Sequence, residues 1–436
     1  MTVETKLPFD QKYIENFSKQ LGEPDWLKDL RLLALAKAEE LPLPKPDKTK
    51  IDKWNFSQFS KHVVSSSTLS SLDELPEEVK TLIEADEEHK NLYIQRDNTP
   101  AFLTVSEDLK EKGVIFTDIH TAAKEHGDLL QQYFMKDGVK IDEHRLTALH
   151  AAYLNGGVFV YVPKNVEVEK PLQAVFIHEN PEANLFNHVI IVADDNSSVT
   201  YVENYISTTE TEGAVFNLIT EVIANTNAKV SYGAVDNLTE NITTYVNRRG
   251  VAGRDAKILW ALGLMNDGNT ISENTTNLVG DGSIGDTKTV VVGRGSQIQN
   301  FTTKVVHFGK HTEGNILKHG VMKDSATSIF NGIGKIEHGA SKSNAEQESR
   351  VLMLSEKARG DANPILLIDE DDVVAGHAAS VGRVDPIQLY YLMSRGISKS
   401  EAERLIIHGF LDPVVRQMPI ESVKNQLTEV IERKVR

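Results

Sequence analysis

The middle of this chain is a long stretch without proline in which apolar residues form strand-sized runs. No proline occurs between Pro181 and Pro364, whereas 19 of the 28 glycines lie between Gly156 and Gly339. β-Branched residues suit the pleat of a strand, and Gly and Asn supply the positive φ angles that tight corners need. The pattern therefore predicts many short strands separated by tight turns.

These runs favour a parallel β-helix over other β architectures. Representative segments are 158–162, 188–192 and 290–292, each bounded by clusters of Asn, Asp, Gly or Glu. Hairpin sandwiches usually show regular turn dipeptides and α/β folds need helical patterns between strands, but neither pattern dominates here. In a parallel β-helix, short strands joined by tight corners bury apolar side chains against the next turn. We expect a β-helix core, with a bent β-sandwich as the alternative.

The first 150 residues carry the pattern of amphipathic helices. Apolar residues recur every three or four positions in several segments, and Asp25 stands as a candidate N-cap of the second. The expected helical segments are 9–21, 25–40, 75–89 and 116–135.

The end of the chain returns to helix. Pro386 suits the first position of a helix, and Ser398 with Glu401 has the spacing of a capping box. Pro413 is expected to interrupt the pattern before the last helix. The expected helices cover 387–395, 399–408 and 421–436. The chain thus divides into a mainly helical region (1–155), a β-helix core (156–384) and a small helical region (385–436).

Composition and charge exclude several classes of function. The chain has no cysteine, which rules out disulfide scaffolds, thiolate metal sites and cysteine nucleophiles. Its 47 Lys and Arg against 63 Asp and Glu give a formal charge of −16, which repels nucleic acid and anionic membranes. The chain start lacks an apolar signal-peptide run, and no uncharged stretch approaches the roughly 20 residues that span a bilayer. We expect a cytoplasmic protein that binds neither nucleic acid nor membrane.

Two glycine motifs match nucleotide-binding strings but lack their structural context. Residues 280–285 fit GxGxxG, yet a β-branched strand pattern follows at 287–292 where the mechanism requires a helix. We therefore expect a β-corner at this place. Gly309 and Lys310 lack the upstream glycine and the following Ser or Thr of a P-loop. The sequence shows no motif for ATP hydrolysis.

The many acidic residues leave a polysaccharide-acting β-helix enzyme open as an alternative. Such an enzyme would use a pair of carboxylates as acid and base or nucleophile. The absence of a secretion signal and the low aromatic content of 7% for stacking sugars argue against it.

Histidine is the main remaining candidate for a soft-leaning metal ligand in a chain without cysteine. None of the 14 histidines forms HExxH or another compact pair, and the strand context separates His307 from His311. His377 follows the acidic run 369–372 and is flanked by small residues. On composition alone, this segment is typical of a solvated loop, with metal binding as the alternative.

Several segments together resemble the SufB/SufD family of iron–sulfur cluster assembly proteins of the SUF system. The segments are 22–28, 41–45, 155–163, 375–382, 394–397 and 405–410. Their order and spacing make the resemblance specific, although no single short motif is decisive, and it covers essentially the whole chain. The resemblance implies a right-handed parallel β-helix flanked by helical N- and C-terminal regions.

The same resemblance implies partners. It describes a non-enzymatic subunit of a SufBCD complex that supports cluster formation and iron acquisition and pairs with SufB as a β-helix heterodimer. A homodimer is the alternative for the isolated chain. The C-terminal helices are expected to bind the SufC ATPase around Tyr390, Leu405, Ile406 and Phe410, or else simply to pack on the final helix. ATP chemistry then belongs to SufC, and thiolates come from SufB or a sulfur donor.

His377 corresponds to a family histidine at the end of the β-helix that is proposed to face SufB. Ala375, Gly376, His377 and Ala378 stand where the family often has Cys-Ser-His-Gly, so the imidazole is kept and the thiol is not. The resemblance implies that His377 is a candidate ligand for iron or a nascent cluster. It also implies that this chain alone binds no cofactor stably and that iron or an iron–sulfur cluster is held transiently in the complex.

Overall fold

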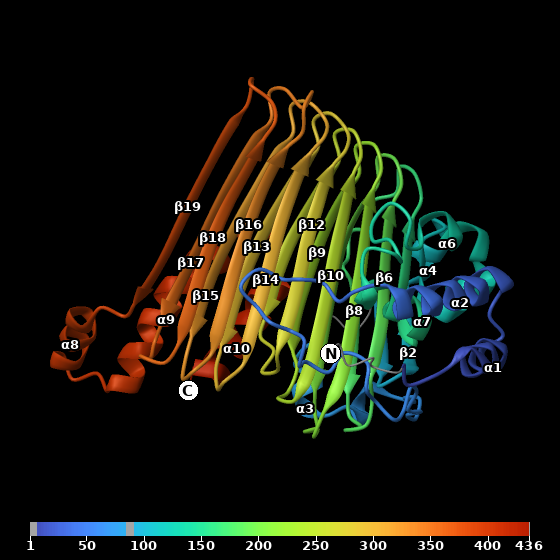
Figure 1. The fold of residues 1–436 in the computed structure, drawn as a ribbon, viewed down its shortest axis with the longest axis horizontal. Helices are drawn as coiled ribbons and strands as arrows, with labels where there is room; N and C mark the ends of the chain where they lie inside the picture. The colour runs from blue at the N-terminus through green and yellow to red at the C-terminus, as the bar shows by residue number, and fades with distance from the viewer. Residues whose placement is uncertain (1–6, 84–90, 436) are drawn as a thin grey trace.

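The centre of the molecule is a solenoid of two β-sheets (Figure 1). The computed structural model describes residues 7–83 and 91–435. From one edge to the other, the first sheet contains β19 (Val374–Arg383), β17 (Asn344–Met353), β15 (Glu313–Met322), β13 (Ile284–Gly293), β11 (Lys257–Leu264), β9 (Lys229–Asn237), β7 (Ser198–Ser207), β5 (Leu172–His178), β1 (Asn91–Arg96) and β2 (Thr99–Thr104). In the same direction, the second sheet contains β18 (Arg359–Ile368), β16 (Thr327–Ile336), β14 (Ile298–His307), β12 (Thr270–Leu278), β10 (Ile242–Ala252), β8 (Ala214–Ala224), β6 (Leu185–Ala193), β4 (Gly156–Val162) and β3 (Ile115–Asp118).

Successive strands from β4 onward alternate between the two sheets, which makes each pair of strands one turn of a coil. Neighbours within a sheet are parallel, as β10 and β12 are, and only the β1–β2 and β3–β4 pairs are antiparallel among the described strands. The predicted parallel β-helix is therefore confirmed, and the β-sandwich alternative is wrong.

A column of corner residues shows how the turns stack. In seven successive turns the same corner holds a residue in the left-handed conformation, with φ between 55° and 72°. These residues are Asn165, Asn196, Asn227, Asp255, Gly282, His311 and Lys342. Asn196 donates its side-chain N–H to Asn165 Oδ1 at 3.0 Å, and Asn227 donates to Asn196 Oδ1 at 3.0 Å. Asn and Gly tolerate this conformation best, which explains their abundance, and Gly282 confirms the corner expected at 280–285.

Side chains fill the space between the two sheets. The rings of Phe176 and Tyr205 stack with centroids 4.4 Å apart, and buried Trp260 donates its indole N–H to Thr276 Oγ1 at 2.9 Å. Each fully buried large apolar side chain contributes about 1.5–3 kcal/mol to folding. The solenoid is thus held by its own packed core.

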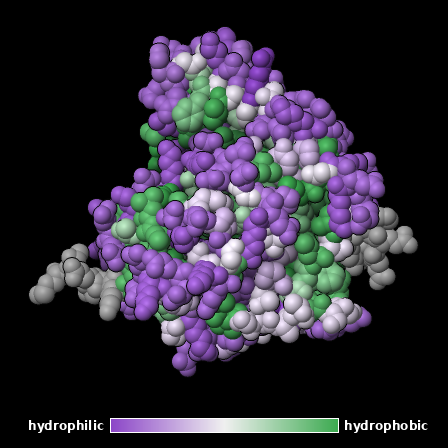
Figure 2. Space-filling model, turned by 90° about the vertical axis from the view of Figure 1, so that its right-hand side faces the viewer, coloured by the Kyte–Doolittle hydropathy of each residue, from purple (hydrophilic) through white to green (hydrophobic). Residues whose placement is uncertain are grey.

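Helices and short strands cover one end of the solenoid. The helical elements are α1 (Gln11–Leu21), α2 (Asp25–Glu40), η1 (Leu72–Glu74), α3 (Glu77–Lys80), α4 (Glu107–Glu111), α5 (Ile119–Glu125), α6 (Gly127–Tyr133) and α7 (Arg145–Tyr153). Ile14 and Leu27 of this region share a buried cluster with Phe186 and Ile190 of β6. Figure 2 shows this end from outside, where hydrophilic side chains surround small apolar patches. The helical region therefore turns its apolar side inward and closes the solenoid.

The N-terminal helix predictions hold in part. α1 and α2 confirm the segments 9–21 and 25–40, but α2 starts at Asp25 with Pro24 in the cap position, so Asp25 is not the cap. The helix predicted over 75–89 is only a short α3 where the chain is described, and its last part lies outside the described residues. The helix predicted over 116–135 is wrong at its start, because β3 pairs with β4 before α5 and α6 begin.

Three helices follow the last strand: α8 (Pro386–Ser394), α9 (Lys399–Val415) and α10 (Glu421–Val435). Ser398 caps α9 as expected, accepting a hydrogen bond from the N–H of Glu401. The predicted interruption at Pro413 is wrong, since α9 continues through this proline. Leu411 and Val414 are buried against the first sheet, and this packing offsets the cost of about 3 kcal/mol for an internal proline. No helix in the described part of the chain is long and apolar enough to cross a membrane.

Candidate functional site

The far end of the solenoid is left open. β18 pairs only with β16 and β19 only with β17, so the last turn presents two strand edges with unpaired backbone N–H and C=O groups. Apolar side chains are exposed on this turn, including Leu367 (45%) and Val374 (63%). An exposed edge with apolar side chains is a template for pairing with another chain. This end is therefore the surface of the solenoid best suited to a partner.

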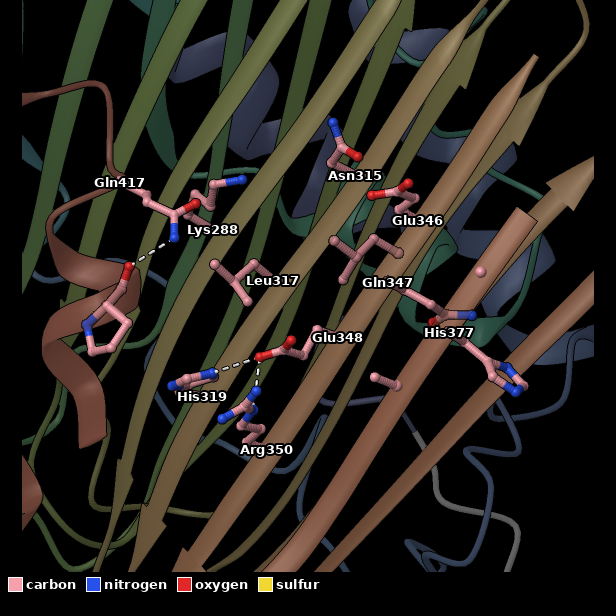
Figure 3. A pocket seen from close by; sticks show the side chains of 14 residues that line it. Lys288, Asn315, Leu317, His319, Glu346, Gln347, Glu348, Arg350, His377 and Gln417 are labelled. Carbon is pink, nitrogen blue, oxygen red and sulfur yellow. Dashed lines mark hydrogen bonds and ion pairs between the residues drawn. The ribbon is translucent and has the colours of Figure 1, made fainter. Parts of the chain in front are cut away.

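His377 lies in the middle of the edge strand β19. It is in register with Gln347 of β17 and is exposed because no further turn covers it. Figure 3 shows its ring directed away from the neighbouring His319–Glu348 pair. The solvated-loop interpretation holds for the acidic run 369–372, but it is wrong for His377, because strand β19 holds this side chain in a fixed register.

The imidazole of His377 has no polar partner within the described residues. No hydrogen bond or ion pair within 7–83 and 91–435 involves its ring. Over the same ranges, no three His, Cys, Asp or Glu side chains converge in a way that could hold a metal ion. Among the described residues, this edge thus carries one unpartnered imidazole and no complete set of metal ligands.

A groove of about 640 Å³ runs beside this strand on the outer face of the first sheet (Figure 3). β15 and β17 form its floor. Pro413 in α9 and Gln417, just after this helix, form one wall. Inside it, Glu348 contacts His319 Nε2 at 3.3 Å and Arg350 Nε at 2.7 Å. His319 also donates from Nδ1 to the carbonyl of Phe410 in α9 at 2.8 Å. The groove therefore joins the C-terminal helices to the strand next to His377.

The four residues predicted to bind SufC differ in how far the structure exposes them. Tyr390 of α8 is 73% exposed and Leu405 of α9 is 42% exposed, while Ile406 is only partly exposed. Phe410 packs on the solenoid, where its ring stacks on His319 at 4.9 Å. With Ile387 at 75%, α8 carries the largest exposed apolar surface of the C-terminal helices. The exposed apolar surface of this region is thus centred on α8, whereas Phe410 packs against His319 of β15.

A buried ionic cluster that the sequence analysis did not predict lies inside the solenoid. Arg248 donates from Nη2 to both carboxylate oxygens of Asp236 at 2.8 and 3.0 Å and lies 3.4 Å from Glu203 Oε1. Burial raises the pKa of the Glu203 carboxyl to about 7, and the guanidinium of Arg248 faces both this carboxyl and the Asp236 carboxylate. Nearer the open end, burial lowers the pKa of Lys318 to about 7. Glu203, Asp236 and Arg248 lie on three different strands, so only the strand register shows that they meet inside the solenoid.

Comparison with known proteins identifies the family. Residues 176–410 match the family described as "SUF system FeS cluster assembly, SufBD core domain", and residues 91–174 match "SufBD protein N-terminal region". The chain is 72% identical over 437 residues to the iron–sulfur cluster assembly protein SufD of Bacillus subtilis strain 168, with 100% of both chains covered. It is 29% identical over 419 residues to an iron–sulfur cluster assembly SufBD family protein of Staphylococcus haemolyticus, with 94% of this chain and 90% of that protein covered. The chain belongs to the SufB/SufD family of iron–sulfur cluster assembly proteins.

Proposed function

We propose that this chain is a non-enzymatic scaffold subunit of a cytoplasmic SufBCD complex that supports cluster formation and iron acquisition. The observation that carries the proposal is the open end of the solenoid, where β18 and β19 are unpaired and His377 is exposed. The similarity to SufD over the whole chain supports it. Family membership also favours this function over a polysaccharide-acting enzyme.

SufB is the partner proposed for the open end. A second β-helix of the same family has edge strands of its own, and two such edges satisfy each other's backbone groups by strand addition. The apolar side chains exposed on the last turn, such as Leu367 and Val374, would be buried in the same contact. The edge could also pair with a second copy of this chain, so a homodimer is the competing state of the isolated protein.

SufC is the partner proposed for the C-terminal helices. α8 exposes Ile387, Tyr390 and Tyr391 at 75%, 73% and 56%, and α8 stands away from the solenoid in Figure 1. Aromatic residues of this kind are enriched at the centres of protein interfaces. The helix therefore has the composition of a docking surface for an ATPase subunit.

His377 supplies one nitrogen to iron or a forming cluster at the SufB contact. Iron binds imidazole nitrogen readily, and a cluster additionally needs thiolates that a chain without cysteine lacks. The remaining ligands in this proposal come from SufB or from a sulfur donor.

Co-purification tests the partner assignment. The tagged full chain, co-expressed with SufB and SufC from the same organism, is expected to bring down both. Tyr390→Asp should lose SufC and keep SufB, because it places a charge on the exposed face of α8 only. Leu33→Asp is the matched control, since Leu33 is 51% exposed on α2 at the other end of the molecule. Stoichiometric SufC on folded Tyr390→Asp protein would contradict the assignment.

Cluster reconstitution tests the role of His377. His377→Ala is expected to leave the three-subunit complex intact and to lower the amount of cluster formed from iron and sulfide. His338→Ala serves as the control, because the side chain of His338 is 92% exposed on a corner of the solenoid. Undiminished reconstitution by His377→Ala would remove the proposed role.

A further inference from the structure

We propose that residues 41–51, the strap, hold edge strand β18 in register at the open end of the solenoid. The strap follows α2 and crosses the outer face of the second sheet (Figure 1). It thus brings part of the N-terminal region to the opposite end of the molecule. The inference goes beyond the proposed function, because it concerns the isolated chain and requires neither SufB nor SufC.

Both ends of the strap are fixed to the helical region. At its start, the carbonyl of Pro42 accepts the backbone N–H of Arg145 in α7 at 2.9 Å. At its end, Ile51 is 4% exposed and belongs to the same buried cluster as Ile271 of β12 and the N-terminal helices. Every second residue from Pro42 to Pro46 is a proline, which favours an extended and semi-rigid course. The strap is therefore a short, stiff segment with two anchored ends.

Between its anchors, the strap bonds to a row of three asparagines on the outer face of the second sheet. Asn331 of β16 donates from Nδ2 to Asn300 Oδ1 of β14 at 3.3 Å. Asn363 of β18 donates from Nδ2 to Asn331 Oδ1 at 2.9 Å. At the inner end of the row, Asn300 Nδ2 donates to the carbonyl of Asp47 and to Thr49 Oγ1, both at 2.7 Å. Asparagine ladders of this kind stabilise stacked strands.

Lys48, at the tip of the strap, bonds to the outer end of the same row. Its Nζ donates to Asn363 Oδ1 at 2.5 Å and lies 3.5 Å from Asp361 Oδ2, and both partners belong to β18. The φ angle of Lys48 is 53°, a left-handed conformation that a lysine keeps only where the surrounding contacts hold it. The strap thus joins the edge strand directly to the helical region.

β18 needs such an attachment more than the inner strands do. Among the described strands it pairs only with β16, and none of its ten residues is fully buried, so the packing that fixes register elsewhere is weak here. Asn363 is in register with Asn331. A slip of β18 by one residue would turn Asn363 to the other face of the sheet, and a slip by two would carry it past both Asn331 and Lys48. The bonds of the strap therefore fit one register only.

Hydrogen exchange on the isolated full chain tests this role. In Lys48→Met, the β18 amides that donate to β16 are expected to exchange about threefold faster than in the unaltered chain, after correction for intrinsic rates. The reason is that detachment of β18 no longer breaks the bonds to Lys48. Lys50→Met is the matched control, because Lys50 is exposed on the same strap and bonds to none of the described residues. Its β18 amides should exchange as in the unaltered chain.

A second variant, Asn363→Val, tests the same contact from the strand. It removes the bonds of Asn363 to Lys48 and to Asn331, so β18 should exchange about tenfold faster. The amide of Thr49 should also exchange faster, because a strap that stabilises β18 is itself stabilised by β18. Unchanged β18 exchange in both variants would overturn the proposal, as would equally faster exchange in Lys50→Met. Unchanged exchange of Thr49 in Asn363→Val would overturn it too, since the asparagine row would then hold β18 without the strap.

Discussion

The two ends of the solenoid are built in opposite ways, and the N-terminal end is sealed. At this end, the Glu221 carboxylate of β8 accepts the backbone N–H groups of Met135 and Val139, both at 2.9 Å. It also accepts Nε2–H of His188 at 2.9 Å, and His188 contacts His150 of α7 at 3.0 Å. All three of these side chains are buried, so the helical region is joined to the sheet by hydrogen bonds that water does not reach.

The C-terminal end has the same strands but no such seal. β19 repeats the register of β17 over ten residues, yet its side chains are mostly exposed and His377 has no polar partner among the described residues. Within those residues, no helix lies over the edges of β18 and β19.

This difference assigns the stability of the fold to one end of the solenoid and the surface free to bind a partner to the other end. The N-terminal end of the solenoid is covered by a helical region and by buried hydrogen bonds. The other end is open, so the strand edges there expose unpaired backbone groups. Residues at the sealed end should therefore govern folding, and residues at the open end should govern association. Substitutions at the two ends test this division.

The largest effect is expected from Glu221→Ala at the sealed end. The change removes the acceptor for two backbone N–H groups and for His188, and it leaves these buried donors unsatisfied. The free energy of unfolding should fall by about 3–5 kcal/mol, measured by urea denaturation of the isolated chain. Glu210→Ala replaces an exposed glutamate before β8 and should stay within about 0.5 kcal/mol of the unaltered chain. Equal stability of the two variants would show that the seal does not hold the fold.

The sequence predicted the repeating part of the molecule better than its ends. Corners need left-handed residues in every turn, so Asn196, Asn227 and Gly282 leave a local signal. The seal joins Glu221 to residues more than eighty positions away, and the groove joins His319 to Phe410, ninety-one positions on. Such contacts have no local pattern. Composition singled out His377 only as an alternative metal ligand, and the family resemblance placed it at the end of the β-helix, because the open edge that exposes it is a property of the assembled sheet.

Acid should weaken the sealed end through His62. Its Nε2–H donates to the carbonyl of Tyr153 at 2.7 Å and its Nδ1 accepts from the Tyr13 hydroxyl at 3.1 Å, which defines a neutral ring. Burial lowers the pKa of His62 from 6.5 to about 3. Between pH 6.5 and 3, the His62 ring is therefore protonated in the unfolded chain but neutral in the folded chain. The stability that the neutral ring contributes above pH 6.5 is lost as the pH falls from 6.5 toward 3.

His62→Gln should reduce this acid sensitivity by up to about 1 kcal/mol per pH unit below pH 6, measured by urea denaturation at several pH values. His338→Gln replaces an imidazole that is 92% exposed nearer the open end and is expected to leave the slope unchanged. Identical slopes for the unaltered chain and His62→Gln would contradict the assignment of the neutral ring.

At the open end, the main expected effect is on association. Leu367→Glu places a charge on the exposed side of edge strand β18 and should weaken SufB binding about tenfold, or about 1.4 kcal/mol, in a direct binding assay. Val279→Glu is the matched control, since Val279 is 52% exposed on a corner far from the open edge. Weakening of SufB binding by the two variants to the same extent would place the partner elsewhere.

The smallest effect on stability is expected from His377→Ala. The ring of His377 is exposed and bonds to none of the described residues, so its removal leaves no buried group unsatisfied and no cavity. The unfolding midpoint should stay within the equivalent of about 0.5 kcal/mol. His188→Ala, the histidine of the seal, should lower the stability by about 2–3 kcal/mol because it strips Glu221 and His150 of a buried partner. If the two histidine variants destabilised the chain equally, the open end would be part of the folded core, and the division between the two ends would fail.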